Sequence, residues 1–244
     1  MAESPRAAAE ASEIVFTCVG NDDDLRHVAL GEDGILHGLP PDGILVDHTT
    51  ASADVARELH AAAEASGRHF IDAPVSGGQA GAEAGTLTVM CGGEPAAFAR
   101  AEPVMHAYGR AVTLLGPAGS GQLTKMVNQI CIAGLVQGLA EAINFAQCAG
   151  LDTDLVLATI SKGAAQSWQM ENRWQTMAEG RFDFGFAVDW MRKDLAICLG
   201  EARRNGAALP VTALVDQLYR LVQQAGGGRW DTSSLIQNLR ELPK

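Results

Sequence analysis

Strand-like apolar runs are confined to the first half of this chain, and this limits the folds that it can adopt. Three of them, over 13–19, 43–47 and 69–73, are short and bounded by turn residues, such as the loop expected over 20–24 after the first, as in a parallel sheet covered on both faces. A helix over 52–66, which Ser52 can cap, separates the second run from the third. The first half therefore predicts a doubly wound, Rossmann-type α/β sheet.

Two further strands are predicted over 86–91 and 111–115, separated by a helical stretch that Pro103 should break or restart. Past Gly121 the strand signals stop, and helical apolar spacing continues to Ala149, which corresponds to roughly 40 Å of helix. Further helices are predicted over 154–161, 167–179, 187–205, 210–224 and 233–241, with Asp152, Pro210 and Asp231 as start signals.

These patterns divide the 244 residues into two predicted domains. Residues 1–118 form a partial domain of the Rossmann type, so the fold class is α/β followed by an all-helical C-terminal domain. Residues 119–244 form the helical domain, which begins with a long interdomain helix. With 47% apolar residues, the chain can build a sizeable core.

The net charge of −11 argues against a nucleic-acid or anionic-membrane surface. The longest apolar stretch, 126–151, is interrupted by six polar residues, and the first ten residues lack the apolar core of a signal peptide. The five cysteines are odd in number and lack Cys-x-x-Cys spacing, which favours reduced thiols over disulfides or zinc. We expect a cytoplasmic protein without a metal site.

Ser76-Gly77-Gly78 follows a predicted strand and should lie at the carboxyl edge of the sheet, where open α/β folds bind ligands. Glycines let backbone N–H groups turn towards an anion, and the serine hydroxyl adds a donor. For an isolated Ser-Gly-Gly, a tight loop that merely needs small residues is the alternative.

Lys125 falls in the first turns of the long helix, where the helix dipole and burial both lower the pKa of an ammonium. Helical spacing places Gln122, Asn128 and Gln129 on its face, so that amides can fix the lysine and hold a reacting oxygen. A solvated surface lysine is the alternative. Lys193-Asp194 is interpreted by default as a surface ion pair.

The remaining aromatic and histidine residues suggest no site. We expect core packing for Trp168, Trp174 and Trp190. The six histidines show no metal-ligand spacing, and we interpret them as solvated or capping residues.

Four segments together resemble the 3-hydroxyisobutyrate dehydrogenase family, within the 6-phosphogluconate dehydrogenase-like superfamily that includes tartronate semialdehyde reductases. They are Asp72-Ala-Pro-Val-Ser-Gly-Gly78, Gly81-Ala-Glu-Ala-Gly-Thr-Leu-Thr88, Gly116-Pro-Ala-Gly-Ser-Gly-Gln122 leading to Lys125, and Lys193-Asp194-Leu195. The resemblance implies an NAD(P)-dependent oxidoreductase of small 3-hydroxyacids or semialdehydes, active as a homodimer or homotetramer. It also implies that residues 1–118 are a partial NAD(P)-binding domain and that residues 119–244 are the substrate and dimerisation domain. It does not distinguish NAD from NADP.

The resemblance also implies residue roles. Lys125 is the general acid/base, and the substrate is held by Ser76, Gly77, Gly78, Asn128 and Gln129. Gln129 stands where most members have asparagine, as in the tartronate semialdehyde reductases, and the tail over 226–233 is similar to theirs. The cofactor contacts carry over to Cys18, Val19, Gly20, Thr50 and Lys193, with glycine at position 20 where the family usually has proline.

The start of the sequence departs from the family. Members begin with two strand–helix units that carry the glycine fingerprint Gly-x-Gly-x-x-Gly, whereas residues 7–12 here match only the segment after them. The alternative function is a non-catalytic fragment that retains the oligomerising helical domain and an acid-binding pocket.

Overall fold

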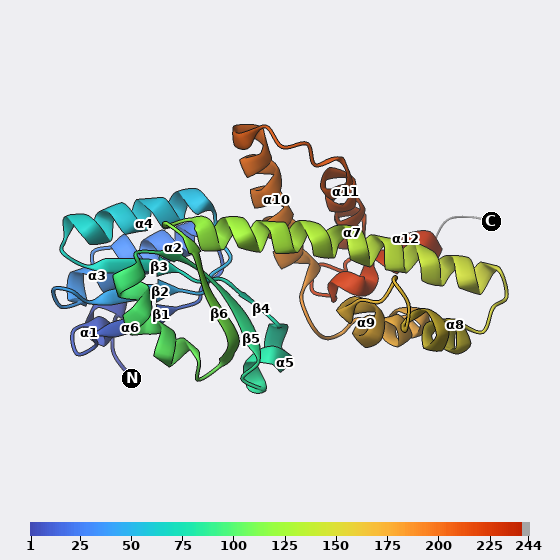
Figure 1. Cartoon of the computed structure of the whole chain (residues 1–244). Coiled ribbons are helices and arrows are strands. Elements are labelled where there is room, and N and C mark those ends of the chain that lie inside the picture. Colours follow the sequence, from blue (N-terminus) through green and yellow to red (C-terminus); the bar gives the residue numbers. More distant parts are fainter. Residues whose placement is uncertain (241–244) are drawn as a thin grey trace. The chain divides into compact units, whose positions relative to one another are not determined.

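The computed structural model describes residues 1–240 (Figure 1). The chain divides into two compact units between Val127 and Asn128. This division falls inside one continuous helix, α7 (Ser120–Cys148), which is the long helix that the apolar spacing predicts.

The first unit is built on a six-stranded sheet in the order β1 (Ile14–Thr17), β2 (Ile44–Asp47), β3 (His69–Asp72), β5 (Leu87–Gly93) and β4 (Val75–Ser76), with β6 (Gly109–Gly116) paired to β5. Strands β1 to β3 are parallel, and their register sets Asp47 beside Asp72. Strand β5 is antiparallel to β3 and β4. The Rossmann-type α/β class is confirmed, and the sheet is mixed.

The antiparallel part has a simple cause. Only a two-residue strand and the six-residue helix α5 (Gly78–Glu83) lie between β3 and β5. A parallel crossover usually runs through a full helix packed on the sheet, and α5 is too short for that, whereas antiparallel neighbours need no such helix.

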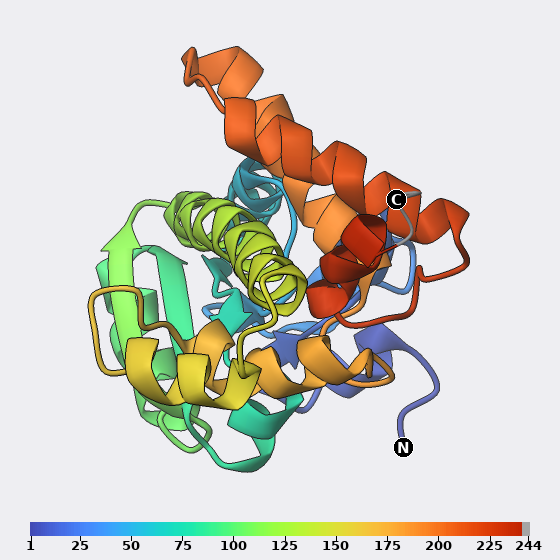
Figure 2. The ribbon, with the colours of Figure 1, turned by 90° about the vertical axis from the view of Figure 1, so that its right-hand side faces the viewer.

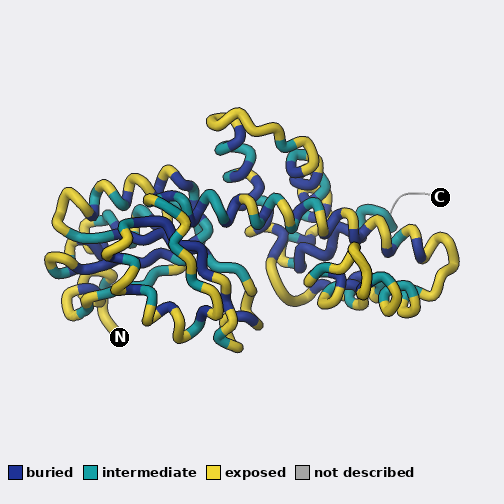
Figure 3. The backbone as a smooth tube through the Cα atoms, viewed as in Figure 1, coloured by how far each residue is buried: buried dark blue, intermediate teal, exposed yellow. Residues whose placement is uncertain are grey.

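Side chains that alternate along the strands fill two cores, one on each face of the sheet. Leu45 and Phe70 pack with the helices α1 (Pro5–Ala9), α2 (Asp22–Leu30), α3 (Ile35–Gly38) and α4 (Ala53–Ala65). Ile44, Val46 and Ile71 pack with α6 (Pro95–Met105). Strands β2, β3 and β5 are accordingly buried along most of their length, whereas β1 is partly buried and β6 is largely accessible. The helices expose their outer faces (Figure 3).

Two local predictions are corrected. Pro103 does not break its helix, because it lies in the last turn of α6 and removes one hydrogen bond just before the helix ends. The acidic run Asp22–Asp24 is not an open loop. It is the first turn of α2, which Asn21 caps by accepting two backbone N–H groups, and carboxylates there complement the helix dipole.

The second unit is all helical, and Figure 2 looks along its longest helix. Helices α8 (Thr153–Ile160) and α9 (Trp168–Glu179) lie on one side of α7, and α10 (Val188–Asn205) and α11 (Pro210–Gln224) on the other. A 3₁₀-helix (Thr232–Ile236) and α12 (Gln237–Arg240) follow. The end of the last predicted helix, Glu241, lies outside the described residues.

The predicted start signals are confirmed. Asp152 and Asp231 accept backbone N–H groups at the starts of their helices, and Pro210 occupies the first turn of α11. The core of the unit includes the fully buried Trp174 and Tyr219. The prediction of core packing is wrong for Trp168 and Trp190, which are 53% and 39% exposed.

Helix α7 is long and apolar enough to cross a membrane, judged by length and composition alone. However, Ala133, Val136, Ala140 and Ile143 on α7 belong to the core of the second unit. A core helix of a soluble protein has the same properties.

Candidate active site

The side chain of Lys125 reaches the short strand β4. Lys125 lies in the second turn of α7 and is only 7% exposed. Its Nζ donates to the carbonyl oxygen of Val75 at 2.9 Å. The ammonium is therefore held against the segment that carries Ser76, rather than lying in bulk solvent.

Asp72 ties the start of α7 to the end of β3. Its two carboxylate oxygens accept the backbone N–H groups of Gly119, at 2.7 Å, and Gln122, at 2.9 Å. Burial raises the pKa of Asp72 to about 6, and these hydrogen bonds to the charged form oppose the rise. The N–H groups at a helix start lack helical partners, so the ionised carboxylate is what anchors this end of α7.

The side chain of Gln122 fixes the loop after β2. Its Nε2 donates to the carbonyl of Thr49 at 2.7 Å, and its Oε1 accepts the N–H of Ala51 at 3.0 Å. Thr50, an expected cofactor contact, lies between these two anchored residues. Gln122 thus holds this loop. The helical spacing had indicated that it would fix Lys125, and that prediction is wrong.

Asp47 organises the ends of β1 and β2. One of its oxygens accepts the hydroxyls of Thr17 and Thr49, at 2.9 and 2.6 Å, and Thr49 in turn accepts the N–H of Val19 at 2.9 Å. Burial raises the pKa of Asp47 to about 6, and nearby Asp72 adds to the rise. The expected cofactor loop at 18–20 is therefore held, through Thr49, by the buried carboxyl group of Asp47.

The residues at this edge fit part of a dinucleotide. Cys18 is exposed, and Val19, Gly20 and Thr50 are partly exposed, so the loops beyond β1 and β2 offer small surfaces against which a ribose or nicotinamide could pack. By contrast, no glycine fingerprint occurs in the sequence, and the start of α2 carries Asp22–Asp24. The carboxylates in the first turn of α2 therefore do not fit a pyrophosphate.

His48 was predicted to be solvated or capping, and the structure corrects this. Its Nδ1 lies 2.6 Å from the carbonyl of Ala73, its Nε2 lies 2.7 Å from the hydroxyl of Tyr108, and its ring stacks on Phe16. Desolvation lowers the pKa of His48. The imidazole braces the segment that leads to Ser76.

In the second unit, Asp194 gathers a cluster around it. Its Oδ2 accepts Nε2 of Gln129 at 2.7 Å, and its Oδ1 lies 3.0 Å from Nζ of Lys193. Asn128 donates to Oε1 of Gln129 at 2.7 Å. Lys193 and Asp194 were predicted to form a surface ion pair. That prediction is wrong, because Asp194 is only 2% exposed.

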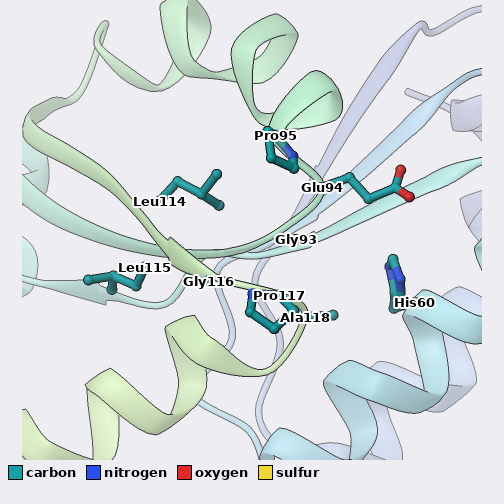
Figure 4. Close-up of a pocket in the computed structure, with 9 residues that line it drawn as sticks. All are labelled: His60, Gly93, Glu94, Pro95, Leu114, Leu115, Gly116, Pro117 and Ala118. Carbon is teal, nitrogen blue, oxygen red and sulfur yellow. The ribbon is translucent and has the colours of Figure 1, made fainter.

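A cavity of about 530 Å³ lies elsewhere in the first unit (Figure 4). His60, Glu94 and Leu114 are among its lining residues, together with residues 115–118 at and just after the end of β6. It includes neither Ser76 nor Lys125, so it is separate from the candidate site. No group of three or more possible metal ligands occurs within residues 1–240.

Comparison with known proteins places both halves of the chain. Residues 1–116 match the family described as the NAD binding domain of 6-phosphogluconate dehydrogenase. Residues 119–239 match the family described as NAD-binding of NADP-dependent 3-hydroxyisobutyrate dehydrogenase. An uncharacterised oxidoreductase of Shewanella frigidimarina is 66% identical over 98% of this chain and 82% of its own length.

The chain belongs to the 3-hydroxyisobutyrate dehydrogenase family. It is also 34% identical to the 2-hydroxy-3-oxopropionate reductase of Escherichia coli, over 97% of this chain and 81% of that enzyme. Among solved structures, the Mycobacterium tuberculosis 3-hydroxyisobutyrate dehydrogenase with L-serine superposes with a TM-score of 0.88 at 29% identity, covering 98% of this chain and 83% of that one.

The family resemblance singled out Lys125 and the segment at 76–78 but gave no role to three buried residues. Asp47 and Asp72 end apolar strands, and a carboxylate directly after a buried run is a signal that could have drawn attention to them. Asp194 carried no such signal, because its burial arises only when α10 packs in the folded unit.

Proposed function

We propose that this member of the 3-hydroxyisobutyrate dehydrogenase family oxidises small 3-hydroxyacids, or reduces the matching semialdehydes, with Lys125 as general acid/base. The observation that carries the proposal is the burial of Lys125 against the carbonyl of Val75. A buried ammonium with a fixed partner is pre-positioned to exchange a proton with a bound hydroxyl group.

The substrate carboxylate is assigned to Ser76, Gly77 and Gly78. Ser76 ends strand β4 and the two glycines follow it; both glycines are exposed and have positive φ, 136° and 62°. Because glycine adopts such angles without strain and has no side chain, a carboxylate can approach the backbone N–H groups closely. The same segment would thus fix the acid end of the substrate and, through Val75, the lysine.

The cofactor contacts are assigned to Cys18, Val19, Gly20, Thr50 and Lys193. Bound NAD or NADP supplies the hydride acceptor in the oxidation and the hydride donor in the reverse direction. Lys125 takes the proton from the substrate hydroxyl oxygen during oxidation and returns it during reduction. The carbonyl of Val75 keeps Nζ in place while its protonation changes.

The substrate class rests on two relatives, one named for 2-hydroxy-3-oxopropionate and one solved with L-serine. Both molecules are three-carbon acids with an oxygen function at the third carbon. We therefore place glycerate, 3-hydroxyisobutyrate and serine in the test panel. Production of reduced nicotinamide with NAD and NADP would be followed for each acid. Turnover that Lys125→Ala abolishes is expected, and absence of turnover with every acid would refute the function.

The alternative, a non-catalytic acid-binding protein, draws on the acidic start of α2. Carboxylates at Asp22–Asp24 repel a phosphate at short range. Calorimetric titration with NADH and NADPH separates the two functions. Weak but measurable binding together with turnover supports the enzyme, whereas acid binding without cofactor binding supports the alternative.

Self-association through the helical unit is part of the proposal, as a homodimer or homotetramer in the cytoplasm. Its helices expose large apolar side chains, among them Phe145 (72%) and Leu214 (59%). Such surfaces commonly mark protein interfaces. Light scattering should show a species larger than a monomer at micromolar concentration, and Phe145→Glu should shift it towards the monomer.

A further inference from the structure

The amide of Gln129 is almost fully occupied within the second unit. Its Nε2 donates to Asp194 at 2.7 Å and also lies 3.6 Å from Sδ of Met191. Its Oε1 accepts from Asn128 at 2.7 Å. A primary amide has two N–H donors and one carbonyl oxygen, so both donors and one of the two lone pairs are engaged.

This arrangement has one chemically reasonable orientation. The reversed amide would set its carbonyl oxygen against the Asp194 carboxylate and its NH₂ group against the donating amide of Asn128. One contact would then place two acceptors together, and the other would place two donors together. The carboxylate thereby determines which way Gln129 points, and Gln129 determines how Asn128 is held.

Exposure separates the two amides. Gln129 is 2% exposed, whereas Asn128 is partly exposed and has its carbonyl oxygen and one N–H beyond the bond to Gln129. A buried, occupied amide has little capacity left for a ligand. Asn128 has that capacity.

We propose that Asp194 is a positioning residue, that Gln129 transmits its orientation, and that Asn128 is the amide that contacts the substrate. This rests on the proposed function, and it changes one of its assignments, because Gln129 becomes a support for Asn128. The second oxygen of Asp194 holds Lys193 at 3.0 Å, so a single carboxylate sets the position of two expected site residues.

A polarity swap tests the chain of contacts. In Gln129→Glu, two carboxylates face each other, and in Asp194→Asn, two amides do. In the double variant Gln129→Glu/Asp194→Asn, the amide–carboxylate bond returns in the opposite direction, the total charge is unchanged, and Asn128 still has an acceptor. We expect about a tenfold or greater loss of kcat/KM for Gln129→Glu, and recovery to within about threefold in the double variant.

Gln137→Glu is the matched control. Gln137 lies two turns later on α7, is also buried, and donates to Glu141 at 2.7 Å. This change creates the same kind of carboxylate contact on the same helix, away from the cluster. It should alter the free energy of unfolding without altering KM.

The double variant decides between the two roles of Gln129. If its free energy of unfolding recovers while KM stays as high as in Gln129→Glu, then Gln129 itself touches the substrate and the proposal is overturned. Should Gln129→Glu fail to fold, Asp194→Asn must show the loss and the double variant must reverse it. A double variant no better than Asp194→Asn contradicts the proposal.

A readout without turnover keeps the two proposals distinguishable. The side-chain amide resonances of Asn128 can be assigned by their loss in Asn128→Ala. They should move in Asp194→Asn and return in the double variant, whether or not any acid is oxidised. Turnover failure with this NMR result refutes only the proposed function, whereas resonances that do not respond to position 194 refute the positioning chain.

Discussion

The two units hold their candidate site residues in different ways. Around Lys125 in the first unit, side chains bind main-chain atoms: Lys125 donates to the Val75 carbonyl, and Asp72 accepts two backbone N–H groups. In the second unit, side chains bind one another, in the chain from Asp194 through Gln129 to Asn128. The position of Lys125 therefore follows the backbone path, whereas the position of Asn128 follows side-chain identity.

This difference predicts opposite responses to substitution. A main-chain partner survives every substitution of a neighbour, so only the residue that makes the contact is critical. A side-chain partner can be replaced by a complementary one, so a second substitution can repair the first. The cluster around Asp194 should show rescue in double variants, and the contacts around Lys125 should not.

Loss of Lys125 should have the largest effect. Lys125→Ala removes the proton-transfer group, and we expect kcat to fall by at least about a hundredfold. Lys125→Arg should be similarly poor because the guanidinium remains protonated. Steady-state kinetics measure this, with the exposed Lys162→Ala as control. Near-normal turnover of Lys125→Ala would remove the lysine from the mechanism.

Asp72→Asn should come next, with losses in both stability and kcat. An amide has one acceptor oxygen, so its NH₂ group would face one of the two N–H groups of Gly119 and Gln122, and a buried unsatisfied donor costs about 1–3 kcal/mol. Urea unfolding and kinetics measure the two losses, and Asp183→Asn is an exposed control. If stability falls while kcat is unchanged, the clamp on α7 does not position Lys125.

Gly78→Ala compared with Gly67→Ala isolates the acid site. Both glycines have left-handed backbones, φ 62° and 67°, and a Cβ on either would meet no atom within 4 Å. Both substitutions should therefore cost about 1–2 kcal/mol of stability from backbone strain alone. Only Gly78→Ala should also raise KM for the acid. Equal KM values in the two variants would contradict the carboxylate assignment.

The smallest effect concerns pH. Because the pKa values of Asp47 and Asp72 rise from 3.8 to about 6, the native state binds more protons than the unfolded state between these values. These groups therefore make the free energy of unfolding fall as pH rises from about 4 to about 6. Asp47→Asn should weaken that fall, as measured by urea unfolding across the window.

Asp42→Asn provides a contrast of opposite sign. Hydrogen bonding to His69 and the charge of Arg100 lower the pKa of Asp42, so this carboxyl makes stability rise with pH near its ordinary pKa. Asp42→Asn should weaken the rise of the free energy of unfolding with pH, whereas Asp47→Asn should weaken its fall. If both variants changed the slope of the free energy of unfolding against pH in the same direction, burial would not be what governs the pKa of Asp47.

Much of the fold was readable from local patterns. The buried strands of the first unit, the caps Ser52 and Asp152, and the long helix all follow from short-range chemistry. The helix α2 was missed because its acidic first turn was interpreted as the loop that ends a strand. The antiparallel turn of the sheet was missed because the connection over 73–86 shows its length but not its direction.

The site residues also divide into those that sequence motifs predict and those that depend on how helices pack. The link between Lys125 and the segment containing Ser76 was expected, since both occur in motifs of the family. The burial of Asp194 could not be predicted, because the adjacent Lys193 favours the interpretation of the two residues as a surface ion pair. Only the packing of α10 with α7 reveals that Gln129 is its other partner.

Helix α7 has a consequence for cooperativity. Its first turn is anchored by Asp72 in one unit, and its later turns supply Ala140 and Ile143 to the core of the other. Because a helix propagates turn by turn from a costly nucleus, melting at one end removes support from the next. The chain should therefore lose both units in one calorimetric transition, with α7 as the shared folding element.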